Sequence, residues 1–406
     1  MKKIENIIFY FPFKGVGGVS DLFIKLSEVL SDTYNTYLVD YHDGTMSTNN
    51  KKSSLFSVNS SEPFPKNSIV VFQSLLPWNI INQENFDDST KVIFWNLHPY
   101  NLYPFMFSVH GNKFKNIVAK SFNFLSYFRK LKIRKLLKIL IEKNSIYFMD
   151  YENKSKTEIF NTISINDQLI LPIFIDKKPQ KKINIPSTIK SIGYIGRLVD
   201  FKIYPLLQII VRLDKLGRKF TFHIIGEGPM KDVLIKKSKS LINIDLIFHG
   251  SINLKNDNEI INNIDLFFAM GLSLLEIAAR GIPVIPMDYS YKKLDRLIKL
   301  KRLNEIKNFN VAEELSDTHH FENKCTIENY INNIDVNYKQ YSEEAIKWTE
   351  EYFSKETFIK NFICAINNSQ VTIKDLRNNN FMKPDFLSVI IKGSINLFKK
   401  KSKYAV

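Results

Sequence analysis

The stretch DLFFAMGLSLLEIAARGIPVI, residues 265–285, carries the strongest structural signal in the sequence. Its apolar run at 266–269 predicts a buried strand, which turns through Gly271 into a helix capped by Ser273. A second apolar run at 283–286 predicts the strand that follows the helix. Because a strand, a helix and a further strand in this order build a parallel sheet, the stretch predicts an α/β domain.

The same alternation extends from this stretch in both directions along the chain. Further strands are expected at residues 7–11, 35–40, 68–73, 91–96 and 145–149 in the first half, and at 191–195, 220–225 and 246–249 in the second. Helical patterns cover residues 19–31, 202–216 and 341–366. A chain of 406 residues is also long enough for two cores. The expected fold class is therefore α/β, with two Rossmann-like doubly wound domains.

Prolines and paired lysines interrupt the alternation and indicate the domain boundaries. Pro172, Pro179 and Pro186 punctuate a lysine-rich stretch that has no periodic pattern, which is typical of a linker. The expected division is an N-terminal domain at 1–176, a linker at 177–190, a C-terminal domain at 191–340, terminal helices at 341–368 and a basic tail at 369–406.

The composition favours a folded protein of a reducing compartment. Hydrophobic residues make up 44% of the chain and aromatic residues 13%, which excludes global disorder. Cys325 and Cys364 have no ligand spacing, so neither a disulfide framework nor a zinc site is expected. No apolar run reaches the roughly 18 residues that cross a bilayer. We therefore expect a cytoplasmic protein, either soluble or peripheral on the inner face of the membrane.

The formal net charge of +16 requires an anionic partner, and one segment concentrates the charge. Residues 113–143 hold ten basic side chains against the single acid Glu142, with apolar residues between them at helical spacing. A basic amphipathic helix of this kind suits an anionic membrane surface. The alternative is an ordinary domain helix with a solvated lysine face. Nucleic acid is not expected as a partner, because no binding module or interleaving of bases and aromatics is present.

A glycine-rich loop follows the first predicted strand. Residues 15–20, GVGGVS, let the backbone turn sharply, and Gly17 and Gly18 lead into a helix whose N-terminus can face a ligand. The spacing departs from GxGxxG because Ser20 replaces the last glycine. Asp40 ends the next strand about 20 residues on, where dinucleotide-binding domains place a ribose ligand. A nicotinamide site and a plain tight turn therefore both remain as alternatives to a sugar-nucleotide site.

Two cations follow the first strand of the second domain. Arg197 and Lys202 lie five residues apart at a strand end, where a guanidinium fork and an ammonium point charge can neutralise a diphosphate. The alternative is that both are solvated surface charges. Ser273 and Glu276 form the capping box S-x-x-E, and the residues Gly271, Leu272, Ser273 and Leu274 are expected to offer free amides to a phosphate.

Taken together, these motifs resemble retaining nucleotide-sugar glycosyltransferases of the GT-B fold, family four, of the polysaccharide-biosynthesis type. The resemblance rests on four elements in order: GR-x(4)-K at 196–202, IIGEGP at 224–229, FHG at 248–250, and LLE-x(4)-G-x-PVI at 274–285. It implies two Rossmann-like domains that face each other across a cleft, with terminal helices that cross back to the N-terminal domain. It also implies a nucleotide-sugar donor and a glycan or lipid-linked acceptor, without a cofactor.

The resemblance assigns roles to particular residues. In such enzymes the Arg and Lys bind the donor diphosphate and the Glu binds the nucleotide ribose, roles that fall to Arg197, Lys202 and Glu276. A histidine near the end of a first-domain strand contacts the donor sugar or the leaving phosphate, which here is His98; a histidine that caps the strand end is the alternative. The family's other glutamate, eight residues before Glu276, is replaced by Phe268.

These assignments imply an enzyme that transfers a sugar, with Arg197, Lys202 and His98 in the catalytic machinery and no metal, since no Asp-Xaa-Asp is present. Because the glutamate at position 268 is missing, a non-catalytic partner subunit with the same fold is the second reading.

Overall fold

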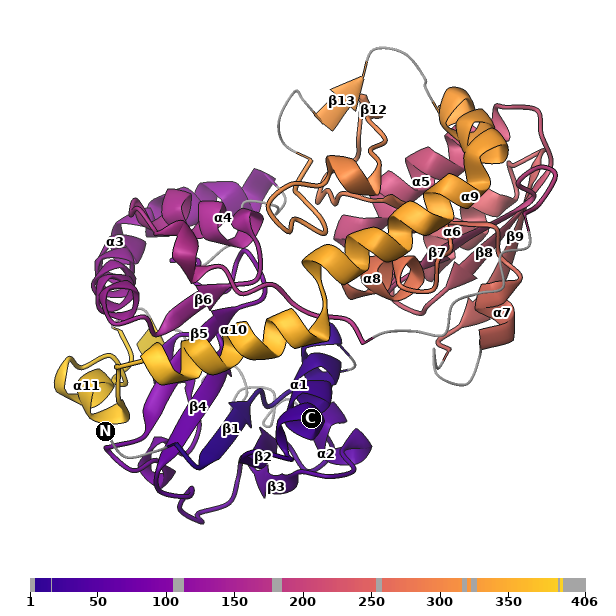
Figure 1. Ribbon diagram of the computed structural model, residues 1–406. Helices are drawn as coiled ribbons and strands as arrows, with labels where there is room; N and C mark the ends of the chain where they lie inside the picture. The colour runs from indigo at the N-terminus through magenta and orange to yellow at the C-terminus, as the bar shows by residue number, and fades with distance from the viewer. Residues whose placement is uncertain are drawn as a thin grey trace, which may run out of the picture. The chain divides into compact units, whose positions relative to one another are not determined.

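The computed structural model describes residues 4–15, 17–104, 113–176, 185–252, 258–315, 320–322, 327–385 and 388–389, without the side chains of 113–125 and 258. Two compact units make up the chain (Figure 1). The first comprises Met1–Ile173 with Ile359–Val406, and the second comprises Phe174–Phe358. Residues 177–184 of the predicted linker and the predicted tail beyond residue 389 lie outside the described residues.

A six-stranded parallel sheet forms the centre of the first unit. Its strands are β1 (Asn6–Tyr10), β2 (Asn35–Asp40), β3 (Ser54–Ser57), β4 (Ser68–Gln73), β5 (Lys91–Asn96) and β6 (Ile146–Phe148), in the order β3-β2-β1-β4-β5-β6. From β1 the chain adds β2 and β3 on one side of the sheet, and then adds β4, β5 and β6 on the other side, so the strand order reverses between β1 and β4. In open α/β sheets, ligands bind at the carboxyl ends of the strands beside such a reversal.

Helices from both ends of the chain cover the first sheet. They are α1 (Gly18–Leu30), α2 (Thr45–Asn49), α3 (Lys113–Glu142), α4 (Tyr151–Asn161), α10 (Lys355–Asn368) and α11 (Ile373–Asn378), with 3-10 turns at η1 (Pro77–Asn79), η2 (Gln83–Asn85) and η3 (Asp167–Leu169). Figure 1 shows α10 lying across this sheet. The buried Trp95 of β5 contacts Phe23 of α1 and Phe362 of α10, with ring centroids 6.3 and 6.2 Å away. The core of the first unit is therefore completed by the C-terminal part of the chain.

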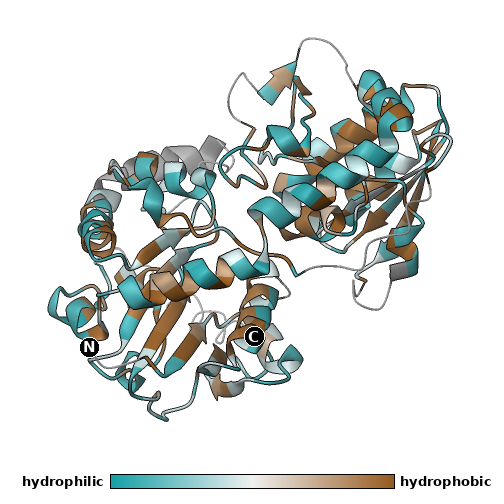
Figure 2. Cartoon of the chain, viewed as in Figure 1, coloured by the Kyte–Doolittle hydropathy of each residue, from teal (hydrophilic) through white to brown (hydrophobic). Residues whose placement is uncertain are grey.

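A five-stranded parallel sheet forms the centre of the second unit. Its strands are β7 (Ser191–Ile195), β8 (Phe220–Ile225), β9 (Ile244–Gly250), β10 (Leu266–Ala269) and β11 (Val284–Pro286), in the order β11-β10-β7-β8-β9. The reversal here lies between β7 and β10. The strands are apolar along most of their length, as Figure 2 shows, because helices bury both faces of a parallel sheet.

The helices of the second unit are α5 (Asp200–Asp214), α6 (Lys231–Ser238), α7 (Asn258–Asn262), α8 (Leu272–Ala278) and α9 (Ile327–Tyr352), which has a kink at Asn337. Between β11 and α9 lie the 3-10 turn η4 (Leu303–Glu305) and a small antiparallel pair, β12 (Leu297–Ile298) with β13 (Phe321–Glu322). Ile203 and Leu206 of α5 and Ile331 and Ile334 of α9 join the buried core of this unit.

The structure confirms the predicted fold class, because both units are Rossmann-like sheets with helices on their faces. The sequence did not predict β3, α2 or α4, whose short or polar sequences lack a clear apolar period. None of the described helices combines the length and the apolar character that a bilayer-crossing helix needs.

Candidate functional site

The predicted donor residues lie where the strand order of the second sheet reverses. β7 and β10 are hydrogen-bonded neighbours, and Ala269 at the end of β10 is paired with Ile195 at the end of β7. The loop that begins at Gly196 and the turn at Gly271 therefore leave the same edge of the sheet from adjacent strands. This topology places the two predicted phosphate-binding segments side by side.

The first loop is built on close contact between two glycine-containing segments. The Gly196 amide donates to the Ile225 carbonyl at 2.9 Å, and the Leu198 amide donates to the Glu227 carbonyl at 2.9 Å. Gly226 has a φ of +141°, and a Cβ at this position would lie 2.0 Å from the Gly196 carbonyl oxygen. Only glycine fits such an approach, which explains physically why the motifs at 196–202 and 224–229 occur together.

The two cations occupy different environments. Arg197 is exposed, whereas Lys202, in the first turn of α5, is half-buried. A Cβ at Gly196 would lie 3.4 Å from the Lys202 Nζ, so the lysine reaches back over the glycine loop. Burial, followed by the charge of Arg197, lowers the pKa of Lys202 to about 8. An anion bound beside the two cations would offset both the burial of Lys202 and its repulsion from Arg197. It would therefore favour the charged form of the lysine.

The turn at the end of β10 differs from the predicted capping box. Gly271, with φ +63°, is the N-cap of α8, and no side chain caps this helix. Because α8 begins at Leu272, Ser273 lies inside the first turn and cannot accept the capping hydrogen bond. Glu276 instead pairs with Arg280 one turn later, with 3.1 Å between Oε2 and Nη1, and both side chains are buried. The prediction of a Ser273–Glu276 capping box was therefore wrong.

Two of the amides predicted to be free at this turn are already bonded. The Gly271 amide donates to the Val311 carbonyl at 3.1 Å, and the Leu274 amide donates to the Gly271 carbonyl at 3.1 Å. A phosphate at this turn is therefore left with the amides of Leu272 and Ser273 as candidate donors. The role of Glu276 toward a ribose stays a prediction, with Arg280 as the group that holds its carboxylate.

Phe268 lies inside β10 and is fully buried in the core of the second unit. The position at which the resemblance has a glutamate is thus part of the sheet. The buried phenyl ring of Phe268 therefore does not take the role that the resemblance gives to that glutamate.

In the first unit, His98 follows the carboxyl end of β5. Its Nδ1 accepts a hydrogen bond from the Tyr100 amide at 3.2 Å, and its own amide donates to the Asn96 Oδ1 at 3.3 Å. The first of these bonds requires Nδ1 to be unprotonated, so a neutral ring carries its proton on Nε2. The histidine therefore caps the strand end, and the same hydrogen bond selects the tautomer that is protonated at Nε2.

The glycine loop after β1 has the form expected of a tight turn into a helix. Gly17 is the N-cap of α1, and Gly18 is the first residue of the helix. Asp40 is fully buried, and its carboxylate accepts hydrogen bonds from three backbone amides. Oδ1 accepts from the amides of Phe13 and Tyr41 and Oδ2 from that of Met46, each at 2.8 Å. A carboxylate committed to three amides does not serve a ribose, so the structure argues against the nicotinamide alternative.

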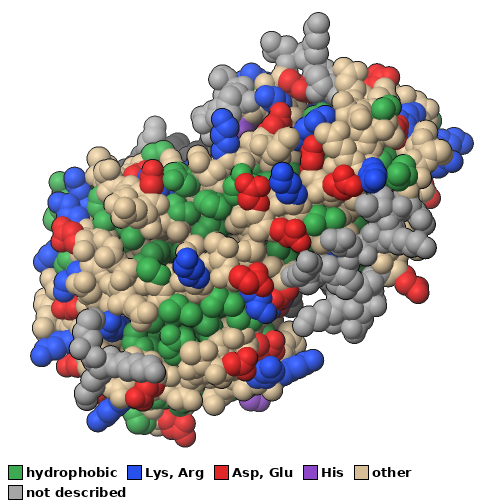
Figure 3. Space-filling view, in the orientation of Figure 1, with side chains coloured by type: hydrophobic (Ala, Val, Ile, Leu, Met, Phe, Trp, Pro, Cys, Tyr) green, Lys and Arg blue, Asp and Glu red, His purple; other side chains and the backbone are tan. Residues whose placement is uncertain are grey.

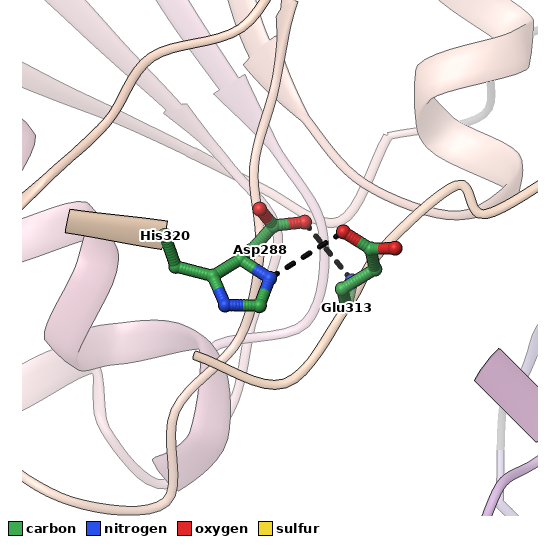
Figure 4. Close-up of side chains that lie close together, drawn as sticks. All are labelled: Asp288, Glu313 and His320. Carbon is green, nitrogen blue, oxygen red and sulfur yellow. Dashed lines mark hydrogen bonds and ion pairs between the residues drawn. The ribbon is translucent and has the colours of Figure 1, made fainter. Parts of the chain in front are cut away.

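One cluster with the donor types of a metal site was not found from the sequence. Asp288, Glu313 and His320 gather after β11 (Figure 4). The ammonium of Lys301 lies between the two carboxylates, 2.9 Å from Asp288 Oδ1 and 3.2 Å from Glu313 Oε2. A cation of the protein itself therefore holds the place that a metal would take.

Comparison with known proteins gives the family of one segment. Residues 176–301 match the family model "Glycosyl transferases group 1". No curated protein sequence matches the chain.

Solved structures extend the likeness to nearly the whole chain. A glycosyltransferase from Rickettsia africae ESF-5 is 16% identical, with 91% of this chain and 99% of that chain covered and a TM-score of 0.56. Anabaena Alr3699/HepE, in complex with UDP and glucose, is 10% identical, with 89% and 99% covered and a TM-score of 0.55. The lipopolysaccharide outer core galactosyltransferase WaaB in its apo form is 14% identical, with 90% and 100% covered and a TM-score of 0.51.

At these identities the solved structures establish the fold, and the family model covers the part of the second unit that holds the predicted donor residues. The chain therefore has the fold of these solved glycosyltransferases, and its residues 176–301 match the glycosyl transferases group 1 family.

Proposed function

We propose that the protein transfers a glycosyl group from a nucleoside-diphosphate sugar to a glycan or lipid-linked glycan in surface polysaccharide synthesis, with retention of configuration. The observation that carries this proposal is that the loop holding Arg197 and Lys202 and the turn at Gly271 follow two adjacent strands at the strand-order reversal of the second sheet. Similar structures include HepE with UDP and glucose and the galactosyltransferase WaaB, which supports a nucleotide-sugar donor and a glycan acceptor.

The chemistry follows from the charges. As the glycosidic bond to the donor breaks, negative charge grows on the departing diphosphate. Arg197 and Lys202 stabilise that charge in a partly enclosed site, and preorganised electrostatic groups of this kind commonly supply the largest share of catalysis. Glu276 cannot serve the diphosphate and is assigned to the ribose hydroxyls, which can donate to its carboxylate.

The test of the donor class is a thermal-shift screen of UDP-, GDP- and ADP-sugars. A donor at 100 times its Kd stabilises the protein by about 2.7 kcal/mol, because it binds only the folded state. Turnover of the stabilising donor by water or an acceptor then separates the proposed enzyme from the alternative, a non-catalytic partner subunit. The alternative is supported by Phe268, which stands where the family has its other glutamate.

His98 is assigned to the donor sugar or the leaving phosphate. The variant His98→Asn keeps a side-chain oxygen for the Tyr100 amide but loses Nε2. We expect it to lower kcat/KM about tenfold, the cost of one well-placed hydrogen bond in the transition state, with an unchanged melting temperature. A variant that melts several degrees earlier and retains full activity per folded molecule would show that His98 only caps the strand.

The membrane proposal needs a different surface from the one that the sequence indicated. The described bases of residues 113–143 do not form one outer face, because three of them hold the C-terminal part of the chain. Arg129 is buried against Asp385, Lys132 donates to the Lys383 carbonyl, and Lys143 pairs with Asp375. On the face seen in Figure 3, basic and acidic side chains are interspersed.

A smaller surface on α3 remains suited to a bilayer interface. Tyr127, Phe128 and Leu131 are 54%, 60% and 42% exposed, and Lys135 and Lys138 of the same helix are exposed as well. Aromatic side chains next to lysines favour the headgroup region of anionic lipid. We propose that this α3 patch contacts the inner face of the membrane.

The α3 patch predicts flotation with vesicles that contain phosphatidylglycerol, release by salt, and little flotation with phosphatidylcholine alone. Combining Tyr127→Ser, Phe128→Ser and Leu131→Ser should lower the vesicle partition coefficient at least about tenfold, since apolar burial drives insertion. Equal flotation of this variant and the wild type, or equal binding to neutral vesicles, would refute the proposal.

A further inference from the structure

The segment that follows β11 contains a largely buried network of four charged or titratable side chains. Three of them, Asp288, Glu313 and His320, are drawn in Figure 4, and the fourth is Lys301. Asp288 and Lys301 are joined at 2.9 Å, Lys301 and Glu313 at 3.2 Å, and Glu313 and His320 at 3.4 Å, measured between the nearest oxygen and nitrogen atoms. Asp288 and His320 are 8% and 9% exposed. Two carboxylates and one ammonium leave one negative charge, which a protonated His320 neutralises.

This network is connected to the Gly271 turn through a short piece of backbone. The Glu313 amide donates to Asp288 Oδ1 at 2.9 Å, and Asn310 Nδ2 donates to Glu313 Oε1 at 2.6 Å. Between these anchors, the Val311 carbonyl accepts the Gly271 amide at 3.1 Å. The Tyr289 amide donates to the Glu313 carbonyl at 2.9 Å, which fixes the segment against the end of β11 as well.

The pKa shifts of Glu313 and His320 both favour the charged forms of these side chains. The His320 hydrogen bond is the largest influence on Glu313, and together with Lys301 it lowers the pKa of Glu313 to about 2 against the effect of burial. Burial alone would lower the pKa of His320, but the hydrogen bond to Glu313 and the charges of Asp288 and Glu313 outweigh it and raise the pKa. Among the described residues, the charged groups that face His320 are Asp288, Lys301 and Glu313.

We propose that His320 is a positioning residue for the donor turn. Together with Lys301 it holds Glu313, and Glu313 holds the segment 310–313, whose Val311 carbonyl fixes the Gly271 amide and thereby the start of α8. The proposal rests on the proposed function, since it assumes that the Gly271 turn contacts the donor phosphate. In this way the segment between β11 and α9 holds the Gly271 turn in place through the Val311 carbonyl.

A dependence on pH follows from the signs of the two shifts. The raised pKa of His320 means that its contribution is complete below about pH 6.5, the usual histidine value, and is lost as pH rises through the raised pKa. The lowered pKa of Glu313 means that its contribution is complete above its usual value of about 4.5 and is lost toward pH 2. Donor affinity should therefore fall as pH rises through the raised pKa of His320 and the ring loses its proton.

The experiment compares the wild type with His320→Gln, whose Nε2 amide can still donate to Glu313 but cannot titrate. UDP is the first probe, with GDP and ADP as the others, and Kd is measured by calorimetry from about pH 6 to 9. Lys202 also titrates in this range, but it is common to both proteins, so the difference between them isolates His320. The matched control is His223→Gln, a half-buried histidine of β8 that lies outside the network.

We expect the rise in Kd across this pH range to be about three- to tenfold larger in the wild type than in His320→Gln, and unchanged in His223→Gln. Hydrogen exchange gives a second readout without nucleotide. In His320→Ala the Gly271 amide should exchange faster, because its acceptor carbonyl is less firmly held. Identical pH profiles in wild type and His320→Gln, or unchanged exchange at Gly271 in a folded His320→Ala protein, would overturn the proposal.

The two proposals fail in different ways. If Arg197→Ala leaves nucleotide affinity unchanged, the donor site is misplaced, whatever His320 does. If nucleotide binding depends on Arg197 but the pH profile does not depend on His320, the donor site stands and the positioning role of His320 is wrong.

Discussion

Replacing Arg197 or Lys202 by Ala is expected to weaken UDP binding by about 1.5–3 kcal/mol each, which is about 10- to 150-fold in Kd. Each variant removes a charge-assisted hydrogen bond to a diphosphate that has few other cations near it in the loop at 196–202. The intact donor should lose the same energy as the free nucleotide, because the diphosphate is common to both. Calorimetry with UDP, and with GDP or ADP if UDP does not bind, measures the loss.

The depressed pKa of Lys202, about 8, adds a second expectation. Its share of the affinity requires the ammonium form, so UDP binding should weaken as pH rises through about 8, and Lys202→Arg should remove that step because arginine stays charged. Lys219 precedes β8 at the opposite edge of the sheet, and Lys219→Ala is the control for a simple loss of positive charge. Full UDP affinity in both Ala variants would mean that the cations do not contact the diphosphate.

The arrangement of the donor site was only partly predictable from the sequence. Apolar runs that end in glycine indicated where β7 and β10 end, because burial and turn chemistry are local properties. The sequence does not state which strands are neighbours, and the pairing of β7 with β10 is what joins Arg197 to the Gly271 turn. The family resemblance supplied that adjacency; the strand periodicity did not.

The capping-box prediction failed because two local rules competed. S-x-x-E fits a helix that starts after Ser273, but Gly271 adopts φ +63° and starts α8 earlier. Glu276 is then drawn into an i,i+4 pair with Arg280, an alternative that the same sequence also permits. Helix boundaries predicted from sequence are uncertain by such one- or two-residue shifts, and here the shift changes the partner of a proposed binding residue.

Ion pairs between residues far apart in the sequence could not be predicted from local sequence patterns. The sequence favoured an anionic membrane surface for the basic helix, with a solvated lysine face as the alternative. Neither fits Arg129, which bonds to Asp385, 256 residues away in the sequence. The network of Asp288, Lys301, Glu313 and His320 is dispersed over a segment with little regular structure, so no periodicity marks it. Pairs of this kind are fixed by the tertiary fold, after the local elements are in place.

The Arg129–Asp385 pair gives the largest expected effect on stability. Arg129 Nε lies 3.1 Å from Asp385 Oδ2, and the two side chains are 9% and 7% exposed. Arg129 also donates to Ser388 Oγ at 2.8 Å, so the pair fastens the C-terminal segment to α3. Arg129→Met should destabilise the first unit by about 3–5 kcal/mol, because it leaves a carboxylate buried without its partner.

Replacing both members should restore much of this loss. Arg129→Met combined with Asp385→Leu leaves no unpaired charge, and buried ion pairs are often replaced by apolar side chains at little cost. The control is Lys138→Met, an exposed change on the same helix that should stay within about 0.5 kcal/mol of the wild type. Urea unfolding, followed by hydrogen exchange of peptides from α3 and from residues 375–389, assigns the loss to the first unit.

The pair also predicts how acid affects the wild type. Burial alone would raise the pKa of Asp385, but Arg129 and Ser388 outweigh it and lower the pKa. The stability that depends on this carboxylate is therefore complete above its usual pKa of about 3.9 and is lost as pH falls through the lower folded value. The double variant should lack that acid-sensitive step. If Arg129→Met alone costs less than about 1 kcal/mol and leaves the exchange at 375–389 unchanged, the pair does not hold the C-terminal segment in place.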